Sequence, residues 1–492
     1  MLFNSLSYAV FLPLVCLAYY AVPHRARWAV LLVFSYYFYM SWNPELVVLI
    51  LFTTAVSWAA GLAVHRLAGR PGLKKAVLVT GIGLCLATLF FFKYFNFVSE
   101  SVTAVLRAVG LPLTAPVLKL VLPVGISFYT FQTLSYIVDV YQGQLAPERH
   151  FGYYALYVSF FPQLVAGPIE RAGNLLPQFR QKHRFSTAQC SEGLRKIGVG
   201  LFKKVVVADY VATFVNNCYN DLHYGEMGGL TLIFATLLFT VQIYCDFSGY
   251  SDIAVGSARL LGFELMENFK SPYFARSVRE FWRRWHISLT TWFTDYVYIP
   301  LGGSRCSRAK HLRNLLITFC LSGLWHGAKW TFVLWGLYHG ILLCVESFYV
   351  RKLDDVQNRL TGTWKGALLN VVRTGVTFAL ASFGWIFFRA NNLQDLIYIL
   401  KNLTRGLNPL LLPHYAAALT MKQYQFVLCL LLLLLVAVYE WITYYKGDPL
   451  QLMKKLPFPV RFFLYWACGC LILVALMTRP IGATADFIYF QF

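Results

Sequence analysis

Two histidines of this sequence lie where an ionisable side chain is unusual. His326 occurs in the stretch LSGLWHGAKWTF, among leucine, tryptophan, glycine and phenylalanine, and His286 occurs in RRWHISLTTW. An ionisable group inside an apolar segment is expensive to bury, so such groups are candidates for function by default. Both histidines are therefore candidates for chemistry.

The residues around His326 favour a buried and neutral imidazole. Trp325 and Trp330 lie close to it in sequence, and Gly323 and Gly327 bracket it, which leaves room for another backbone or for a substrate. A buried imidazole stays neutral near pH 7, and a general base must be neutral to accept a proton. Because no metal or flavin motif is present, the simplest chemistry here is proton abstraction from a hydroxyl group.

Two other roles for His326 remain open on these grounds. It could be a core histidine that is hydrogen-bonded to a neighbouring helix, or it could be a metal ligand. A metal site would need further His, Cys or carboxylate ligands at suitable spacing, and the sequence contains no HxxxH or HExxH. We therefore predict no metal, and we favour a catalytic or ligand-binding role over a structural one.

Five further ionisable residues lie in apolar segments, and for each a structural role in joining helices stands beside a role in chemistry. They are Asp139, Asp246, Asp252, Asp295 and His339. If one helix ran through His326 and His339, the two rings would lie about 20 Å apart along its axis and on different sides. Such a pair could not easily act on one atom.

The composition indicates a membrane protein. Of the 492 residues, 58% are hydrophobic and 13% are charged, and the mean hydropathy of +0.55 is high for a soluble domain. Apolar stretches near the ~20 residues that cross a bilayer recur, for example Leu46–Val64, Ala76–Phe92 and Phe426–Trp441. They predict an all-α polytopic fold with roughly 11 spanning helices, and their continuous character disfavours a β-barrel.

Basic residues give the chain a formal net charge of +21, and they gather in short clusters between the apolar runs. The clusters are His24–Arg27, Phe179–Arg184, Arg276–Arg284 and Ser304–Arg313. This distribution is typical of the positive-inside rule, which we favour over a specific anionic partner for any single cluster. Nucleic-acid binding is not needed to explain the charge.

We expect one membrane domain, 1–492, with four parts. Residues 1–97 are simple apolar helices that form an N-terminal scaffold, and 122–388 form a core. Residues 393–425 are a polar connector, and 426–492 form C-terminal helices. Motifs rich in Gly, Pro and polar residues interrupt the core. Backbone that leaves helical geometry in lipid is tolerated only where it is buried in protein or lines a water-filled cavity, so the core should surround a site.

Several long motifs carry a resemblance to a known family. FWRRWHISLTTWFTDYVYIPLGGSR and LSGLWHGAKWTFVLWGLYHG, with YCDFSGYSDIAVGSARLLGFELMENFKSPY before them and GWIFFRANN after them, closely resemble the membrane-bound O-acyltransferase family. The similarity is to the bacterial alginate O-acetyltransferase branch and covers nearly the whole chain. It implies a helical membrane fold, with short re-entrant or interfacial helices, around a central tunnel.

The resemblance also implies roles for individual residues. His326 falls on the histidine at the narrow point of the family's tunnel, and His286 falls on its second polar position. We expect His326 to accept the proton of the attacking hydroxyl and His286 to stabilise the developing oxyanion or the thioester carbonyl. The further candidates for the tunnel wall or donor binding are Trp285, Trp325, Arg283, Arg284, Asp246, Asp252, Asp295 and Lys329.

Charged residues are expected at the cytosolic mouth of the tunnel. Arg283, Arg284 and the loop Arg305–Arg313 could attract the phosphates of coenzyme A or an acidic carrier protein. Lys329 could hold an anion, but we favour snorkelling of its ammonium group to the interface.

The resemblance implies a cytosolic thioester donor, acetyl-CoA or an acyl-carrier thioester, with no bound cofactor. It also implies a multi-pass protein of the bacterial inner (plasma) membrane, an extracytoplasmic polysaccharide as acceptor, and a separate serine esterase-like partner, since the chain has no GxSxG motif. A D-alanyl transferase acting on teichoic acid is the alternative within the class. A transporter or polysaccharide flippase is the alternative from another class, and the lack of an internal repeat counts modestly against it.

Overall fold

The computed structural model describes residues 1–111, 113–118, 120, 122–165, 167–220, 222, 227–408, 422–478 and 487–488. Within these residues the regular structure is helical, with no β-strand. The all-α fold class predicted from the apolar runs is therefore confirmed. Part of the polar connector, 409–421, and most of the C-terminal tail lie outside the described residues.

The chain forms two compact units. The first consists of 1–197 with 250–266, and the second consists of 198–249 with 267–492. The long helix α12 (Gly229–Leu260) contributes residues to both units. Both candidate histidines belong to the second unit.

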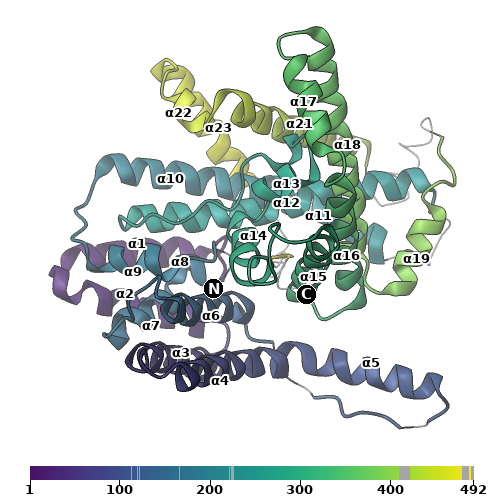
Figure 1. Cartoon of the computed structure of the whole chain (residues 1–492). Coiled ribbons are helices and arrows are strands. Elements are labelled where there is room, and N and C mark those ends of the chain that lie inside the picture. The colour runs from purple at the N-terminus through teal and green to yellow at the C-terminus, as the bar shows by residue number, and fades with distance from the viewer. Residues whose placement is uncertain are drawn as a thin grey trace. The chain divides into compact units, whose positions relative to one another are not determined.

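The first unit is built on α3 (Val47–Arg66), α4 (Pro71–Leu89) and α6 (Ile126–Gln142), which pack against one another. Figure 1 shows α3 and α4 side by side, with α5 (Phe95–Ala108) continuing beyond α4. The other helical elements of this unit are α1 (Leu6–Ala21), α2 (His24–Met40), η1 (Pro44–Leu46), η2 (Phe90–Tyr94), α7 (Phe151–Ser159), α8 (Phe161–Leu164), α9 (Ala172–Arg180) and most of α10 (Thr187–Leu201), whose last four residues belong to the second unit.

Glycine defines both ends of α6. Gly125 before the helix has φ 75° and Gly143 after it has φ 76°, a left-handed conformation that glycine adopts without a steric penalty. A side chain at Gly125 would also meet the backbone carbonyl of Leu164. Glycine at this position therefore permits both the turn and the close approach of α8.

The second unit contains an antiparallel hairpin of α15 (Arg308–His326) and α16 (Trp330–Glu346). The two helices lie against each other in Figure 1, and α18 (Trp364–Arg389) packs on α16. The other helical elements of this unit are η3 (Phe202–Ala208), α11 (Asp209–Asn220), η4 (Pro272–Phe274), α13 (Val278–Arg284), α14 (Ile287–Phe293), η5 (Thr294–Tyr298), α17 (Val350–Arg359), α19 (Leu393–Asn402), α21 (Gln423–Lys446), α22 (Pro449–Met453) and α23 (Phe458–Met477).

Two glycines allow the hairpin to pack at backbone contact. A Cβ atom at Gly323 would collide with the carbonyl of Phe332, and one at Gly336 would collide with the carbonyl of Phe319. Small residues at helix crossings of membrane proteins let two backbones approach closely. The space beside Gly323, which the sequence left open between a backbone and a substrate, is thus filled by the backbone of α16.

Six described helical segments are long and apolar enough to span a membrane, and the bent pair of α16 and α17 would make a seventh. The six are Pro44–Arg66, Pro71–Ala108, Gly229–Leu260, Trp364–Arg389, Tyr424–Lys446 and Phe458–Met477. The three apolar stretches quoted from the sequence all lie in such helices. The total of roughly 11 stays a prediction, because helices such as α1 and α2, with 16 and 17 residues, are shorter.

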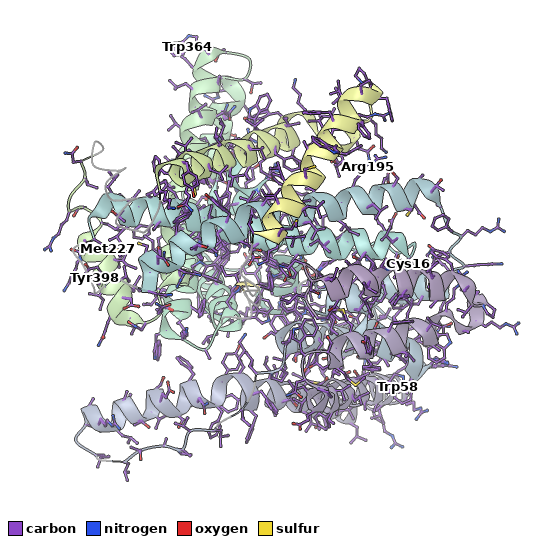
Figure 2. The ribbon with its side chains drawn as sticks, turned by 180° about the vertical axis from the view of Figure 1, so that it is seen from behind. Cys16, Trp58, Arg195, Met227, Trp364 and Tyr398 are labelled. Atoms are coloured by element: carbon purple, nitrogen blue, oxygen red, sulfur yellow. The ribbon has the colours of Figure 1, made fainter. Side chains whose placement is uncertain are left out.

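Large apolar side chains are exposed on α23 and at the start of α18. None of the residues of α23 is buried, and Phe462, Phe463 and Trp466 on it are about 60% exposed, at 61%, 61% and 58%. Trp364, at the first turn of α18, is 72% exposed and projects from the end of that helix in Figure 2. Tryptophan near the end of a spanning helix suits the interface between headgroups and hydrocarbon.

The close packing of α15 on α16 predicts that alanine changes stability differently at Gly336 and at Gly375. Gly336→Ala should destabilise the protein by about 1–3 kcal/mol, because the new methyl group meets the carbonyl of Phe319. Gly375→Ala is the matched control: nothing lies within 4 Å of a Cβ there, and alanine stabilises a helix interior by about 0.5–1 kcal/mol relative to glycine. Thermal melting in detergent measures both, and equal melting temperatures for the two variants would contradict the close packing.

Candidate active site

His326 lies at the end of a helix, where the chain leaves α15. It is the last residue of that helix, and 327–329 connect it to α16. A Cβ atom at Gly327 would collide with the ring of Phe332, so glycine lets that ring close over the connection. The His326 side chain is thereby held at the base of the hairpin and is 4% exposed.

Aromatic rings surround the imidazole of His326. The ring centroids of Trp325, Trp335 and Phe388 lie 5.0, 4.9 and 5.3 Å from it, each in an edge-to-face arrangement. Trp335 is on α16 and Phe388 is on α18, so three helices define the position of this ring. The predicted burial of His326 is confirmed, and its catalytic role stays a prediction.

His286 lies between two short helices and is fully buried, at 0% exposure. It precedes α14 and has φ 43° and ψ 56°, a left-handed conformation that is rare for residues other than glycine. Its ring lies 4.6 Å from that of Phe247 and 5.8 Å from that of Trp325, measured between centroids. Trp325 therefore contacts both histidines, and the structure brings the two predicted catalytic residues to one indole.

Burial controls the protonation of His286. Loss of solvation lowers the pKa of its imidazole from 6.5 to about 3. The ring is therefore neutral at physiological pH, with one N–H donor and one acceptor nitrogen. A neutral imidazole can donate a hydrogen bond to a carbonyl oxygen, which fits the role predicted for this residue.

His339 lies on a different helix from His326, so the separation expected for one continuous helix is wrong. The chain reverses between α15 and α16, and the ring of Trp335 then lies 4.9 Å from His326 and 5.1 Å from His339. His339 is 1% exposed, and a Cβ atom at Gly384 would lie 2.6 Å from its Nε2. His339 thus packs directly against the backbone of α18.

Trp385 joins Trp285, which precedes His286, to Trp335, which contacts His326. Trp285 is 1% exposed, and its ring centroid lies 4.8 Å from that of Trp385 on α18. Trp385 in turn lies 5.9 Å from Trp335. We refer to Trp285, Trp325, Trp335, Trp385 and Phe388 as the aromatic cluster.

Asp246 belongs to a buried ion-pair network. Its Oδ1 lies 2.6 Å from Nζ of Lys204, which also lies 2.9 Å from Oδ1 of Asp209. The backbone N–H of Ile488 donates to Oδ2 of Asp246 at 2.8 Å. Burial lowers the pKa of the Lys204 ammonium, but the charges of Asp246 and Asp209 outweigh it, so the pKa stays above its ordinary value.

Asp246 is linked to His286 through its neighbour in the chain, while its own carboxylate pairs with Lys204. Asp246 precedes Phe247 on α12, and Phe247 is the residue that contacts His286. The network therefore anchors the turn of α12 that presents Phe247. A part in donor binding is not tested for Asp246 and stays a prediction.

The remaining predicted residues are Asp252, Asp295 and Lys329. Asp252 belongs to the first unit, where its Oδ1 is 3.8 Å from Nζ of Lys196. Asp295, on η5, is exposed, and so is Lys329 before the first turn of α16. Burial, followed by the charge of Arg389, lowers the pKa of Lys329.

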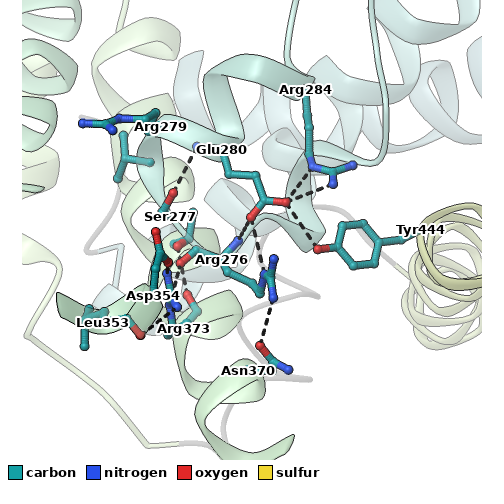
Figure 3. Close-up of polar contacts among 12 residues, drawn as sticks. Arg276, Ser277, Arg279, Glu280, Arg284, Leu353, Asp354, Asn370, Arg373 and Tyr444 are labelled. Carbon is teal, nitrogen blue, oxygen red and sulfur yellow. Dashed lines mark hydrogen bonds and ion pairs between the residues drawn. The ribbon is translucent and has the colours of Figure 1, made fainter. Parts of the chain in front are cut away.

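The two arginines before Trp285 differ in their surroundings. Arg283 is exposed, whereas the guanidinium of Arg284 donates to Oε1 of Glu280 at 2.9 Å and lies 4.6 Å from the ring centroid of Tyr444. Figure 3 shows this ion pair, with Tyr444 also donating to Glu280. Arg284 is thus held within the protein, and Arg283 is the more accessible of the two.

Sequence reasoning missed four residues that build the site. Trp335 and Phe388 lie in the quoted motifs LWGLYHG and GWIFFRANN, yet nothing in the sequence says that their rings meet His326. Lys204 has a detectable signal, because it is a charge inside the apolar run GVGLFKKVVVA. Asn268, which bonds the residues after His286, has no signal in the sequence, because it follows Glu267 in the polar stretch MENFKS.

Comparisons with known proteins are consistent across the chain. The model of the membrane-bound O-acyltransferase family, MBOAT, matches residues 148–382. The chain is 40% identical over 385 residues to a protein named probable alginate O-acetylase AlgI from Pseudomonas putida, covering 78% of this chain and 76% of the relative. The matched family range contains both histidines and Trp335.

Two other relatives differ in their named acceptors. A peptidoglycan O-acetyltransferase from Helicobacter pylori is 34% identical over 451 residues, covering 84% of this chain and 81% of the relative. A teichoic acid D-alanyltransferase from Bacillus subtilis is 26% identical over 276 residues, covering 54% and 68%. The similarity to the O-acetyltransferases is thus greater in both identity and extent.

The buried ion pair predicts a large effect for one lysine. Lys204→Met should destabilise the protein by about 3–5 kcal/mol, because it leaves the carboxylates of Asp209 and Asp246 buried without their cation. Lys196→Met is the matched control: its pair with Asp252 is longer and less buried, so a change within about 1 kcal/mol is expected. Thermal melting and membrane abundance are the measurements, and an abundant, stable Lys204→Met protein would contradict this assignment.

The lowered pKa of His286 predicts a dependence of stability on pH. The unfolded chain takes up a proton on this imidazole below about pH 6.5, whereas the folded protein does so only near pH 3. Stability should therefore fall as pH drops from 6.5 towards 3, by at most about 1.4 kcal/mol per pH unit from this group.

His286→Gln removes the titrating group and should reduce that loss. The melting temperatures of both proteins at pH 7 and pH 5 measure the effect. An equal fall for wild type and variant would show that His286 titrates alike in the folded and unfolded protein, which contradicts its burial.

Proposed function

The chain belongs to the membrane-bound O-acyltransferase family, and we propose that it moves an acetyl group from a cytosolic thioester through the membrane for O-acetylation of an extracytoplasmic polysaccharide. Membership confirms the resemblance of the motifs, and with it the activity class: the protein is an O-acyltransferase with several membrane-spanning helices. The acetyl group, the polysaccharide and the path through the membrane are the proposal. The names of the alginate and peptidoglycan relatives support it.

The observation that carries the mechanism is the contact of both histidines with Trp325. Two buried imidazoles held against one fixed indole are suited to act on neighbouring atoms of one bound substrate. Groups fixed in place before the reaction need little reorganisation in the transition state. The surrounding rings exclude water, which would otherwise compete with the acceptor hydroxyl for the acyl group.

In the proposed step, the acceptor hydroxyl oxygen attacks the carbonyl carbon of the thioester. His326 accepts the hydroxyl proton as the new C–O bond forms, and the neutral His286 donates a hydrogen bond to the carbonyl oxygen as negative charge develops there. The C–S bond then breaks, and the proton on His326 passes to the departing thiolate. The products are the ester and the free thiol, and both histidines return to their starting state.

Donor binding is proposed at the cytosolic side. Arg283 is exposed next to Trp285, and Arg305, Arg308 and Arg313 are exposed in and after the basic loop. These cations suit the phosphates of acetyl-CoA or the acidic surface of an acyl carrier protein. Because Glu280 holds Arg284, that residue supports the end of α13 in this proposal, and Arg283 faces the donor.

We propose a separate extracytoplasmic partner, a serine esterase-like protein that passes the acetyl group to the polysaccharide. The support is that the chain contains no GxSxG motif of its own. The site of action is then the bacterial inner membrane, with the donor on the cytosolic side and the acceptor on the other. Basic clusters between the apolar runs fit that orientation through the positive-inside rule.

A D-alanyl transferase acting on teichoic acid is the second candidate. The similarity to the Bacillus subtilis teichoic acid D-alanyltransferase favours it, although that match covers only 54% of this chain. Transfer of label from [14C]acetyl-CoA to polysaccharide by membranes containing the protein distinguishes the two. Acetyl transfer supports the first candidate, and transfer only from a D-alanyl carrier protein supports the second.

The central prediction concerns His326. His326→Ala should lower acyl transfer by about 10²–10⁴-fold, because it removes the proposed general base. The measurement is the acetyl content of surface polysaccharide, normalised to the abundance of the protein in the membrane. The matched control is His65→Ala, because His65 is an exposed histidine near the end of α3 in the first unit.

Acetylation near the wild-type level in His326→Ala, with normal abundance, would contradict the catalytic assignment. Equal loss in His65→Ala would show that the assay reports protein stability rather than chemistry. A normal melting temperature for His326→Ala separates the loss of a reacting group from the loss of the fold.

A further inference from the structure

The backbone at His286 is held in a conformation that its own residue type disfavours. Only Ser271 and His286 have positive φ among the described non-glycine residues, at 47° and 43°. A left-handed conformation costs about 1–2 kcal/mol for a residue with a Cβ atom. Neighbouring structure must therefore supply interactions that stabilise it.

Asn268 supplies three of these interactions to the residues directly after His286. Its backbone carbonyl accepts the N–H of Ile287 at 3.0 Å. Its side-chain Oδ1 accepts the N–H of Ser288 at 3.3 Å and the hydroxyl of Ser288 at 2.7 Å. Asn268 is 1% exposed, so these bonds do not compete with bulk water.

Lys270 holds the chain on the other side of the histidine. Its backbone N–H donates to the carbonyl of Arg284 at 3.0 Å, and the guanidinium of Arg284 donates to the carbonyl of Lys270 at 2.9 Å. Bonds from 268–270 thus fix the chain both before Trp285 and after His286. The two residues between these bonds must turn sharply, and both of their side chains enter the protein interior.

We infer that Asn268 is a positioning residue for His286, whose imidazole it directs towards Trp325 by fixing the start of α14 in the left-handed turn. This inference rests on the proposed function in one respect: the orientation of His286 matters for activity only if His286 takes part in acyl transfer. Asn268 acts through its oxygen atoms. A backbone N–H can only donate, so the bond from Ser288 identifies the side-chain atom as Oδ1.

The amide nitrogen of Asn268 gives the means to test the inference. Nδ2 is buried and has no hydrogen-bond partner among the described residues. An aspartate side chain would therefore retain the oxygen that Ser288 needs, without losing a bond that the described residues make. Asn268→Asp is the conservative variant, and Asn268→Ala removes the acceptor altogether.

The expected result is a loss in kcat. Asn268→Ala should lower kcat for acyl transfer by about 100-fold, because a misplaced catalytic group costs that much, while KM for the acyl donor stays within about threefold. Asn268→Asp should recover most of that loss at the acid end of the pH range of activity, where its buried carboxyl group is protonated and uncharged. Ser288→Ala, which leaves the backbone bonds in place, should have a smaller effect than Asn268→Ala.

A double variant separates positioning from general destabilisation. In a His286→Ala background, Asn268→Ala should cause no further fall in kcat, because the residue on which it acts is gone. A further fall of the same size would overturn the inference. Wild-type kcat in Asn268→Ala would also overturn it, and so would equal losses in the Asp and Ala variants at the acid end of the pH range of activity.

Failure of the proposed function has a different signature. If His286→Ala alone keeps wild-type activity, His286 is not catalytic, and the positioning role is decided by an experimental structure of Asn268→Ala. Residue 286 with negative φ and its ring withdrawn from Trp325 would support the role. An unchanged left-handed residue 286 would overturn it.

Discussion

The edge-to-face contact of Trp325 with two imidazoles is the interaction on which the rest of the second unit depends. Trp325 is the penultimate residue of α15, so the position of that helix sets the position of the indole. His326 follows it directly, whereas His286 comes from a turn 40 residues earlier that is stabilised by its own hydrogen bonds. Any shift of α15 relative to that turn would separate the two rings. Both the close packing of α15 on α16 and the fixation of the turn by Asn268 are therefore needed to keep the two imidazoles against Trp325.

Two groups of charges near this contact are paired internally. Lys204 forms ion pairs with Asp209 and Asp246, and Arg284 forms one with Glu280. An unpaired ion close to the imidazoles would shift their protonation, since interactions between charges are strong where water is excluded. Paired charges can anchor α12 and α13 with little effect on the pKa of His286. The arrangement separates the task of holding helices from the task of moving a proton.

The fold class and the burial of His326 could be predicted from the sequence, whereas the contacts between distant helices could not. Apolar runs predicted the helical membrane fold, and the conflict between His326 and its neighbours predicted a buried imidazole. Gly327 is the C-cap of α15 and a helix-stop signal, but Gly323 lies inside the same helix, so glycine alone does not reveal that the chain reverses at 327–329. That reversal brings Trp335 to the ring of His326. Contacts between distant segments, such as His326 with Phe388, depend on helix packing that no local pattern encodes.

The backbone conformation of His286 shows most clearly what a local sequence pattern cannot predict. Histidine has no strong preference for left-handed φ, so RRWHISLTTW alone predicts a helix that continues through the residue. The helix ends instead because 268–270 bond the chain on both sides of Trp285 and His286. A continuous helix would turn successive side chains by about 100°, so Trp285 and His286 would point in other directions than they do at the break. The break in the helix is thus the means by which two adjacent residues reach the aromatic cluster, and its stabilisation by a distant asparagine is a tertiary effect rather than a local one.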